Sequence, residues 1–210
     1  NGNANDESGN GYNLTAVGLP VLCTDRNSEI NRAYYFSSSG PTQNKFDFPV
    51  GAINTFNNLN SGTVSLWVNV VNHIVSGHYF GFDNIFFNKE KYGSNAQCLI
   101  GLNGGSTKIR FHMTGALPSN DLISNTSLGV GSWHLITISW NGTTHKIFID
   151  GVLDVSRNSN EYLSNQQDPS YLSVGGFDQV GSPGCFSNID DIAIYNRALT
   201  QEEITALYTG

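Results

Sequence analysis

The chain has 210 residues, of which 13% are charged, and it carries a formal net charge of −7. This acidic balance argues against nucleic acid as a partner, because phosphate recognition needs a basic face. The sequence has no apolar run of about 18 residues, the length of a membrane span, and no recognisable signal peptide. Its length predicts one domain, covering residues 1–210, with a sizeable core.

Residues 1–13 are polar and rich in glycine. Within them Asp6, Ser8 and Asn10 occupy alternate positions, and Gly11 follows. Oxygen side chains at this spacing before a glycine are typical of the first half of an EF-hand calcium loop. The twelfth position of such a loop would be Val17 instead of Glu, so the EF-hand is not complete. The stretch is therefore either a plain Asn/Gly turn or half of a cation site whose missing carboxylate comes from elsewhere.

From residue 14 onward, short β-like runs follow one another. Clean alternation predicts a strand over residues 62–70, and the Asn-Gly and Asp-Gly pairs at 141–142 and 150–151 predict hairpin turns. The other β-like runs cover residues 33–36, 46–50, 79–87, 97–102, 108–113, 135–140, 146–149, 171–175 and 189–195. Thr200 and Glu203 form a capping box, which predicts one short helix at the end of the chain. This pattern predicts an all-β sandwich.

The last predicted strand contains a carboxylate at an unusual position. Simple alternation over residues 189–195 puts Asp190 on the same face as Ile192 and Ile194. A carboxylate on an apolar face is costly unless it is paired or binds a metal ion. Asp190 is therefore either a metal ligand or a strand-end residue that reaches solvent.

Three cysteines, Cys23, Cys98 and Cys185, lie far apart in the sequence. The absence of a Cys-x-x-Cys pair excludes a zinc ribbon or a thioredoxin-type centre. Because the number is odd, at least one thiol is free or pairs between chains. The apolar surroundings of Cys98 and Cys185 favour buried structural thiols.

Six segments together are similar to laminin-G-like domains of the concanavalin A-like lectin/glucanase superfamily. They are residues 3–11, 33–36, 64–68, 131–135, 147–151 and 188–199, in that order. The resemblance covers essentially the whole chain, and it implies a jelly-roll sandwich of two antiparallel sheets. The first strand of the family precedes the Asn-rich loop and is absent here, so we expect the chain to be a piece of a larger protein.

The resemblance also implies a calcium ion between the first loop and the last strand. Asp6 matches the loop carboxylate of the family, and Asp190 matches the first Asp of its final motif. Because calcium takes six to eight oxygen ligands, Asn10 and Asn13 are the expected further ligands. The role of this Ca²⁺ would be structural, since it would join the two ends of the chain.

Catalysis is not expected from this sequence. The glucanases of the superfamily carry the pattern Glu-x-Asp-x-x-Glu on their active strand, whereas the matching strand here has only Asp190-Asp191 and no Glu. The chain also has no Gly-x-Ser-x-Gly elbow and no His-Glu-x-x-His motif. A glycoside hydrolase remains only a remote alternative.

The resemblance implies an extracellular module, secreted or at the cell surface, that recognises a glycan. A protein-binding or adhesion module without a sugar site is the alternative. The three tryptophans (Trp67, Trp133 and Trp140) lie in strand motifs and are expected to pack in the core. Aromatic residues expected in loops are better candidates for stacking on sugar rings, although each could also pack at the edge of the core: Tyr79, Phe82, Tyr92, Tyr162 and Phe177.

Overall fold

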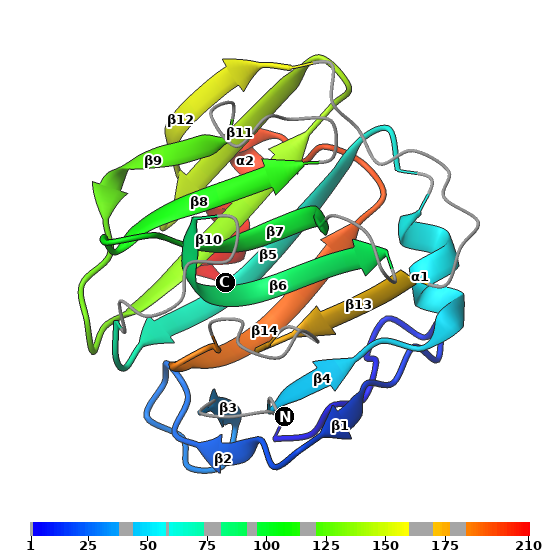
Figure 1. Cartoon of the computed structure of the whole chain (residues 1–210), viewed down its shortest axis with the longest axis vertical. Helices are drawn as coiled ribbons and strands as arrows, with labels where there is room; N and C mark the ends of the chain where they lie inside the picture. The colour runs from blue at the N-terminus through cyan, green and yellow to red at the C-terminus, as the bar shows by residue number, and fades with distance from the viewer. Residues whose placement is uncertain are drawn as a thin grey trace.

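Two seven-stranded antiparallel sheets pack against each other (Figure 1). The structure, a computed structural model, describes residues 2–37, 44–57, 59–73, 81–91, 96–113, 121–159, 170–176 and 184–210. Sheet A has the strand order β1 (Thr15–Val17), β4 (Lys45–Asp47), β13 (Ser170–Val174), β6 (Phe82–Lys91), β7 (Ala96–Asn103), β8 (Lys108–Met113) and β9 (Leu122–Ser127). Sheet B has the order β12 (Val152–Asn158), β11 (Thr144–Ile149), β10 (Trp133–Trp140), β5 (Gly62–Val70), β14 (Ser187–Tyr195), β3 (Ala33–Phe36) and β2 (Val21–Cys23). The predicted all-β sandwich is confirmed.

Local turn chemistry sets the register of the hairpins in sheet B. Between β10 and β11, the backbone N–H of Asn141 donates to the carbonyl of Thr144 at 3.2 Å. Between β11 and β12, Asp150 and Gly151 have φ angles of 52° and 77°. Positive φ at both central residues is what a type I′ turn requires, and this turn matches the twist of the flanking strands. Both hairpins predicted from the sequence are confirmed.

The core lies between the sheets and is built from alternate residues of each strand. On β5, Val64, Leu66, Val68 and Val70 all point inward and are completely buried. Apolar residues of β7 and β8 cover them from sheet A. Cys98 and Cys185 are buried in this core, as predicted, and all three cysteines are free thiols.

Two helices flank the sandwich. Helix α1 (Val50–Phe56) begins after Pro49 and places Ile53 and Phe56 in the core. Helix α2 (Gln201–Thr209) lies against the outer face of sheet B, where Ile204 packs against Phe148. No helix in the described part of the chain is long and apolar enough to cross a membrane.

Candidate functional site

A β-bulge in β14 changes the faces that simple alternation predicts. Asp190 pairs with Trp67 and Ala193 pairs with Ser65, so two residues of β14 lie opposite the single residue Leu66 of β5, and the bulge adds one residue. Asp191 has a φ of 42° within the bulge. As a result Asp190 shares the outer face of sheet B with Trp67, while Ile192 and Ile194 pack toward the core. The prediction that Asp190 points the same way as these isoleucines is wrong, because a bulge adds residues and resets the alternation.

Asp190 is nevertheless buried, with only 9% of its surface exposed, and Arg26 is its partner. The Arg26 guanidinium donates to Oδ2 of Asp190 at 3.3 Å and also binds Asp191. The same guanidinium lies over the ring of Trp67, 4.8 Å from its centroid. Burial, followed by the neighbouring Asp191 carboxylate, raises the pKa of Asp190 to about 6, against the opposing effect of Arg26. In this structure the buried carboxylate of Asp190 is paired with Arg26.

The N-terminal loop folds around the carboxylate of Asp6. Its Oδ1 accepts the backbone N–H of Ser8 and its Oδ2 accepts that of Tyr12, both at 2.8 Å. Hydrogen bonds from Ser8 and Tyr12 hold the pKa of Asp6 below its ordinary value. Asn13 turns its side chain to the backbone N–H of Asp6 at 2.8 Å, and the amide of Asn10 donates to Oγ of Ser8 at 2.7 Å. The loop is thus a set of side-chain-to-backbone turns.

A cavity of about 1040 Å³ joins this loop to the last strand. Asp6, Asn10 and Asp190 all line it, and Asn13 does not. β14 pairs with β3 only from Ser187 to Ile189, so within the described residues the following part of this edge has no strand partner and faces the cavity.

The donors around this cavity fit calcium in their chemistry, because they are carboxylate, amide and hydroxyl oxygens. Three of the four predicted ligands line one cavity, although Asp190 lies far from Asp6 and Asn10 in the sequence. Among the residues that the structure describes, no three His, Cys, Asp or Glu side chains gather closely enough to hold a metal ion. Calcium therefore stays a prediction.

Of the predicted sugar-stacking residues, Phe82 lies in the described part of the chain, and it is buried. Phe82 is the first residue of β6 and has no exposed surface, and the Arg110 guanidinium lies over its ring at 5.1 Å. The expectation that Phe82 is a loop aromatic is therefore wrong, because the residue is a buried part of a strand. Tyr79, Tyr92, Tyr162 and Phe177 lie outside the described residues.

Histidines in the described residues act as partners of aspartates. His73 contacts Asp83 at 2.8 Å, and His112 contacts Asp121 at 2.7 Å. Arg110 binds the same Asp121 carboxylate at 2.7 Å. The side chains of Asp83, His112 and Asp121 are buried and that of His73 is half-buried, and the hydrogen bonds of both pairs are made within the protein.

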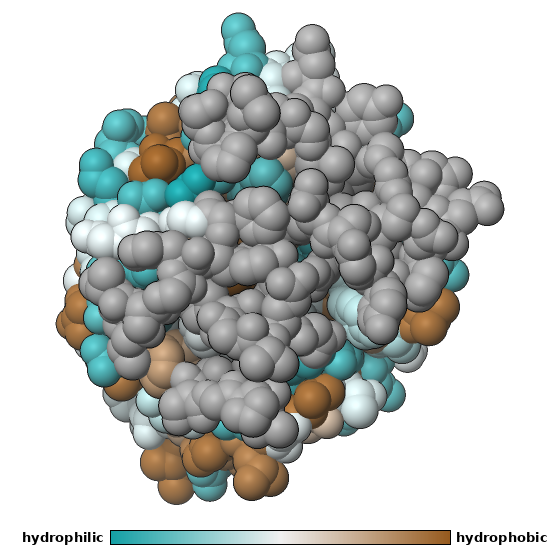
Figure 2. Space-filling model, viewed as in Figure 1, coloured by the Kyte–Doolittle hydropathy of each residue, from teal (hydrophilic) through white to brown (hydrophobic). Residues whose placement is uncertain are grey.

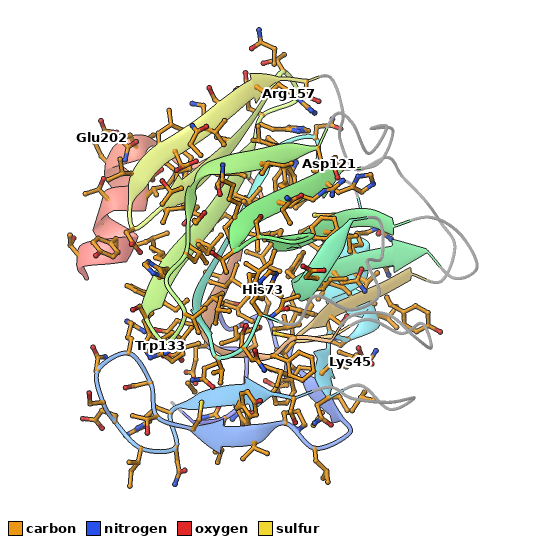
Figure 3. All side chains as sticks on the ribbon, turned by 60° about the vertical axis from the view of Figure 1, so that its left-hand side comes forward. Lys45, His73, Asp121, Trp133, Arg157 and Glu202 are labelled. Atoms are coloured by element: carbon orange, nitrogen blue, oxygen red, sulfur yellow. The ribbon has the colours of Figure 1, made fainter. Side chains whose placement is uncertain are left out.

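An aromatic pocket on the outer face of sheet B was not predicted. Trp140 packs in the core as expected, with 1% of its surface exposed, but Trp67 and Trp133 line a pocket of about 340 Å³. Tyr208 of α2 stacks on Trp67, with ring centroids 5.6 Å apart and planes inclined by 22°. Arg26 and Asn27 complete the polar side of the pocket, and Thr209 and Gly210 lie beside it. Figure 3 shows Trp133 between the loop that joins β2 to β3 and the end of α2.

The alternation of β5 could have predicted that Trp67 faces outward and lines this pocket. Val64, Leu66, Val68 and Val70 occupy the inward positions of β5, so Trp67 has to lie on the opposite face together with Ser65 and Asn69. Trp67 is nevertheless buried, with 9% of its surface exposed, because Tyr208 and Arg26 cover its ring on the outer face of sheet B.

The sequence places the chain in a family. The laminin G model of the concanavalin A-like lectin/glucanases superfamily matches residues 40–205, so the chain belongs to this superfamily. The resemblance and the fold predicted from the sequence are thereby confirmed. Comparison with curated protein sequences gives no significant match.

Several solved structures share the fold at low sequence identity. Domain 4 of AbnA, an extracellular arabinanase from Geobacillus stearothermophilus solved with arabinotriose, has a TM-score of 0.66 at 18% identity, over 98% of this chain and 93% of that one. A botulinum neurotoxin type C structure, described as depending on two ganglioside molecules for cell entry, has a TM-score of 0.67 at 17% identity, over 97% and 47% of the two chains. The binding domain of botulinum neurotoxin DC, in complex with rat synaptotagmin II, gives 0.66 at 16% identity, over 97% and 48%. The chain thus spans about half the length of these neurotoxin binding domains.

Proposed function

We propose that this chain is a non-catalytic carbohydrate-binding module with a structural calcium ion. The aromatic pocket formed by Trp67, Trp133 and Tyr208 is the observation that carries the proposal. Sugar rings present apolar C–H faces and polar edges, so they suit a site with aromatic walls and a few placed polar groups. Arg26 and Asn27 supply such polar groups at the rim.

The similar structures support this class of ligand. AbnA domain 4 was solved with arabinotriose, and the type C neurotoxin is described as interacting with gangliosides. Both ligands contain sugar, and both proteins share this fold. As part of the same proposal, the module acts outside the cell and belongs to a longer secreted or surface protein.

A non-catalytic role is proposed from the residues of the last strand. β14 carries Asp190 and Asp191 but no glutamate, whereas glycosidases of this superfamily need a set of carboxylates on the active strand. Asp190 and Asp191 share Arg26 as a partner, which leaves them poorly suited as nucleophile and acid.

A glycan array tests the binding proposal, with wild type and the Trp133→Ala variant measured side by side. We expect wild type to bind a defined class of sugar and the variant to bind it roughly two- to tenfold more weakly, since an aromatic contact contributes roughly 0.5–1.5 kcal/mol. Val152→Ala is a matched control, because Val152 is exposed on β12 and does not line the pocket. Equal binding by wild type and Trp133→Ala would exclude this pocket as the site.

The calcium proposal has its own test, a thermal melt in calcium and in chelator. Asp6, Asn10 and Asp190 would hold the ion, with Asn13 brought in by a turn of its side chain, and the ion would join the N-terminal loop to β14. We expect chelator to lower the melting temperature of wild type and to leave that of Asp190→Ala unchanged. Asp190→Ala also removes the ion pair with Arg26, so the response to chelator is the diagnostic quantity and not the melting temperature alone.

Asp154→Ala provides the control for the calcium test. Asp154 accepts the backbone N–H of Thr126 at 3.0 Å and connects β12 to β9, away from the cavity. Its loss should lower stability but preserve the response to chelator. Identical wild-type melts with and without calcium would refute the calcium proposal.

A protein-binding role is the second candidate, and one surface favours it. Val17, Leu19, Val21, Leu22 and Ile30 are exposed near the edge strands β1 and β2. Brown side chains gather at the lower end of Figure 2, where Figure 1 draws these strands. Exposed apolar patches of this kind often mark protein interfaces. The neurotoxin DC domain was solved with synaptotagmin II, so a protein partner is also known for this fold.

A further inference from the structure

A row of four side chains crosses the outer face of sheet B. Trp133 of β10 pairs with Asn69 of β5, Asn69 pairs with Asn188 of β14, and Asn188 pairs with Tyr35 of β3. Directly paired residues in an antiparallel sheet point to the same side. Since Val68 and Val70 point into the core, Asn69 and its partners point outward. All four residues are half-buried, so the row belongs to the surface.

The chemistry of this row suits a sugar chain. An aromatic ring stands at each end, and two amides, each with donors and an acceptor, lie between them. The row contains no charged side chain. Beside the row, the Arg26 guanidinium binds the carboxylates of both Asp190 and Asp191. A neutral ligand rich in hydroxyl groups is therefore the matching class.

Asn69 has a side-chain carbonyl oxygen that receives no hydrogen bond from the described residues. Its Oδ1 is shielded from solvent, and none of the described residues donates a hydrogen bond to it. An acceptor that is desolvated but unpaired costs roughly 1–3 kcal/mol. Because this oxygen is covered, a ligand hydroxyl reaches it only if the Asn69 side chain turns toward the surface, and the hydrogen bond made there would recover part of that cost.

The length of the row sets the size of the ligand. From β10 to β3 there are three strand spacings of about 4.8 Å, or roughly 14 Å in all. This span exceeds a single sugar ring. Trp133 also lines the aromatic pocket, so the row and the pocket meet at this residue.

We propose that the row from Trp133 to Tyr35 binds a neutral linear oligosaccharide that runs across the strands, with one end in the aromatic pocket. The inference rests on the proposed carbohydrate-binding function and adds the size, charge and direction of the ligand. A terminal monosaccharide would occupy only the Trp133 end.

The test is calorimetric titration with neutral oligosaccharides of one to six units derived from arabinan, xylan and β-glucan. We expect affinity for one of these series to increase with length until the chain spans the row and then to level off. Tyr35→Ala should weaken binding of the longest member about tenfold and leave the shortest binding members unchanged, because only long chains reach β3.

Asn69→Ala provides a second variant in case Tyr35→Ala does not fold, and thermal melts establish folding in both. The Asn69→Ala substitution should weaken binding of every oligosaccharide that is too long to fit within the aromatic pocket. Val152→Ala, on the exposed edge of the same sheet, should behave as wild type.

The outcomes separate the inference from the function on which it rests. If wild type binds a series but its affinity is independent of length, or if Tyr35→Ala and Asn69→Ala both bind as wild type does, the row is not the site while carbohydrate binding stands. Preference for an acidic oligosaccharide over its neutral counterpart would also overturn the inference. If no oligosaccharide binds, on the array or in titration, both the inference and the proposed carbohydrate-binding function are refuted. A protein partner would then be the favoured ligand.

Discussion

At the scale of single residues, burial in the core strongly changes the pKa values of two thiols, those of Cys98 and Cys185. Burial raises the pKa of each to about 12, from an ordinary value of 9.0. Between pH 9 and pH 12 these two thiols keep their protons in the native protein and lose them in the unfolded chain. The thiols therefore contribute stability below pH 9, and this contribution is lost as the pH rises toward 12.

A comparison of wild type with Cys185→Ala tests this pH dependence. We expect the free energy of unfolding of wild type to fall more steeply between pH 9.5 and 11, by up to about 1.4 kcal/mol per pH unit for one thiol. The cavity left by Cys185→Ala costs stability equally at all pH values, so only the difference in slope counts. Parallel curves would contradict the prediction.

Lys89 makes the matched comparison necessary. Burial lowers its pKa to about 8, so between pH 8 and 10.5 the unfolded chain binds more protons and the contribution of Lys89 rises with pH. This effect opposes that of the thiols in wild type alone. It is the same in both proteins and cancels in the comparison, because Cys185 is not among the groups that shift the Lys89 pKa.

At the scale of elements, the parts that the sequence predicts are those with a local chemical cause. The Asn-Gly and Asp-Gly hairpins and the capped helix α2 have such causes within a few residues. None of the four edge strands (β1, β2, β9 and β12) was predicted, because most of their residues are exposed and only the start of β9 alternates between buried and exposed residues. Helix α1 was also missed: it has only seven residues, and Pro49 at its start makes no side-chain cap.

The cap of α2 gives a prediction at this scale. Oγ1 of Thr200 accepts the backbone N–H of Glu203 at 3.3 Å, and Oε2 of Glu203 accepts that of Thr200 at 2.9 Å. Thr200→Ala should lower the free energy of unfolding by about 1 kcal/mol, measured by denaturant titration. Thr209→Ala, at the last residue of the helix, is the control and should change stability much less. Equal effects of the two substitutions would show that the cap is not what stabilises α2.

The same cap should weaken in acid. The hydrogen bond from Arg197, followed by that from the Thr200 backbone, lowers the pKa of Glu203 to about 2. A lowered carboxylate pKa means stability that is present above pH 4.5 and is lost as the pH falls toward 2. The difference in free energy of unfolding between wild type and Glu203→Gln, which lacks this carboxylate, should therefore shrink below pH 4.5.

At the scale of the whole molecule, the sequence predicted the class of fold but not the contacts between distant segments. Alternation identified most of the strands, yet nothing local showed that β14 lies between β5 and β3, or that Tyr35 and Trp133 share a row. Asp6, Asn10 and Asp190 line one cavity, and the calcium site that they would form stays a prediction. Arg26 was missed, because its loop carries no motif and only the fold brings it to Asp190.

The central position of β14 has a consequence for how the chain folds. β2 and β3 are made first, but in sheet B they connect to the other strands only through β14, which lies close to the end of the chain. Synthesis proceeds at about 5–20 residues per second, so the first strands remain without their neighbour for on the order of ten seconds. The sheet can close only after β14 has been synthesised, through contacts between segments that lie far apart in the sequence. Such closure is slow because the entropy of a long loop is lost before any contact forms.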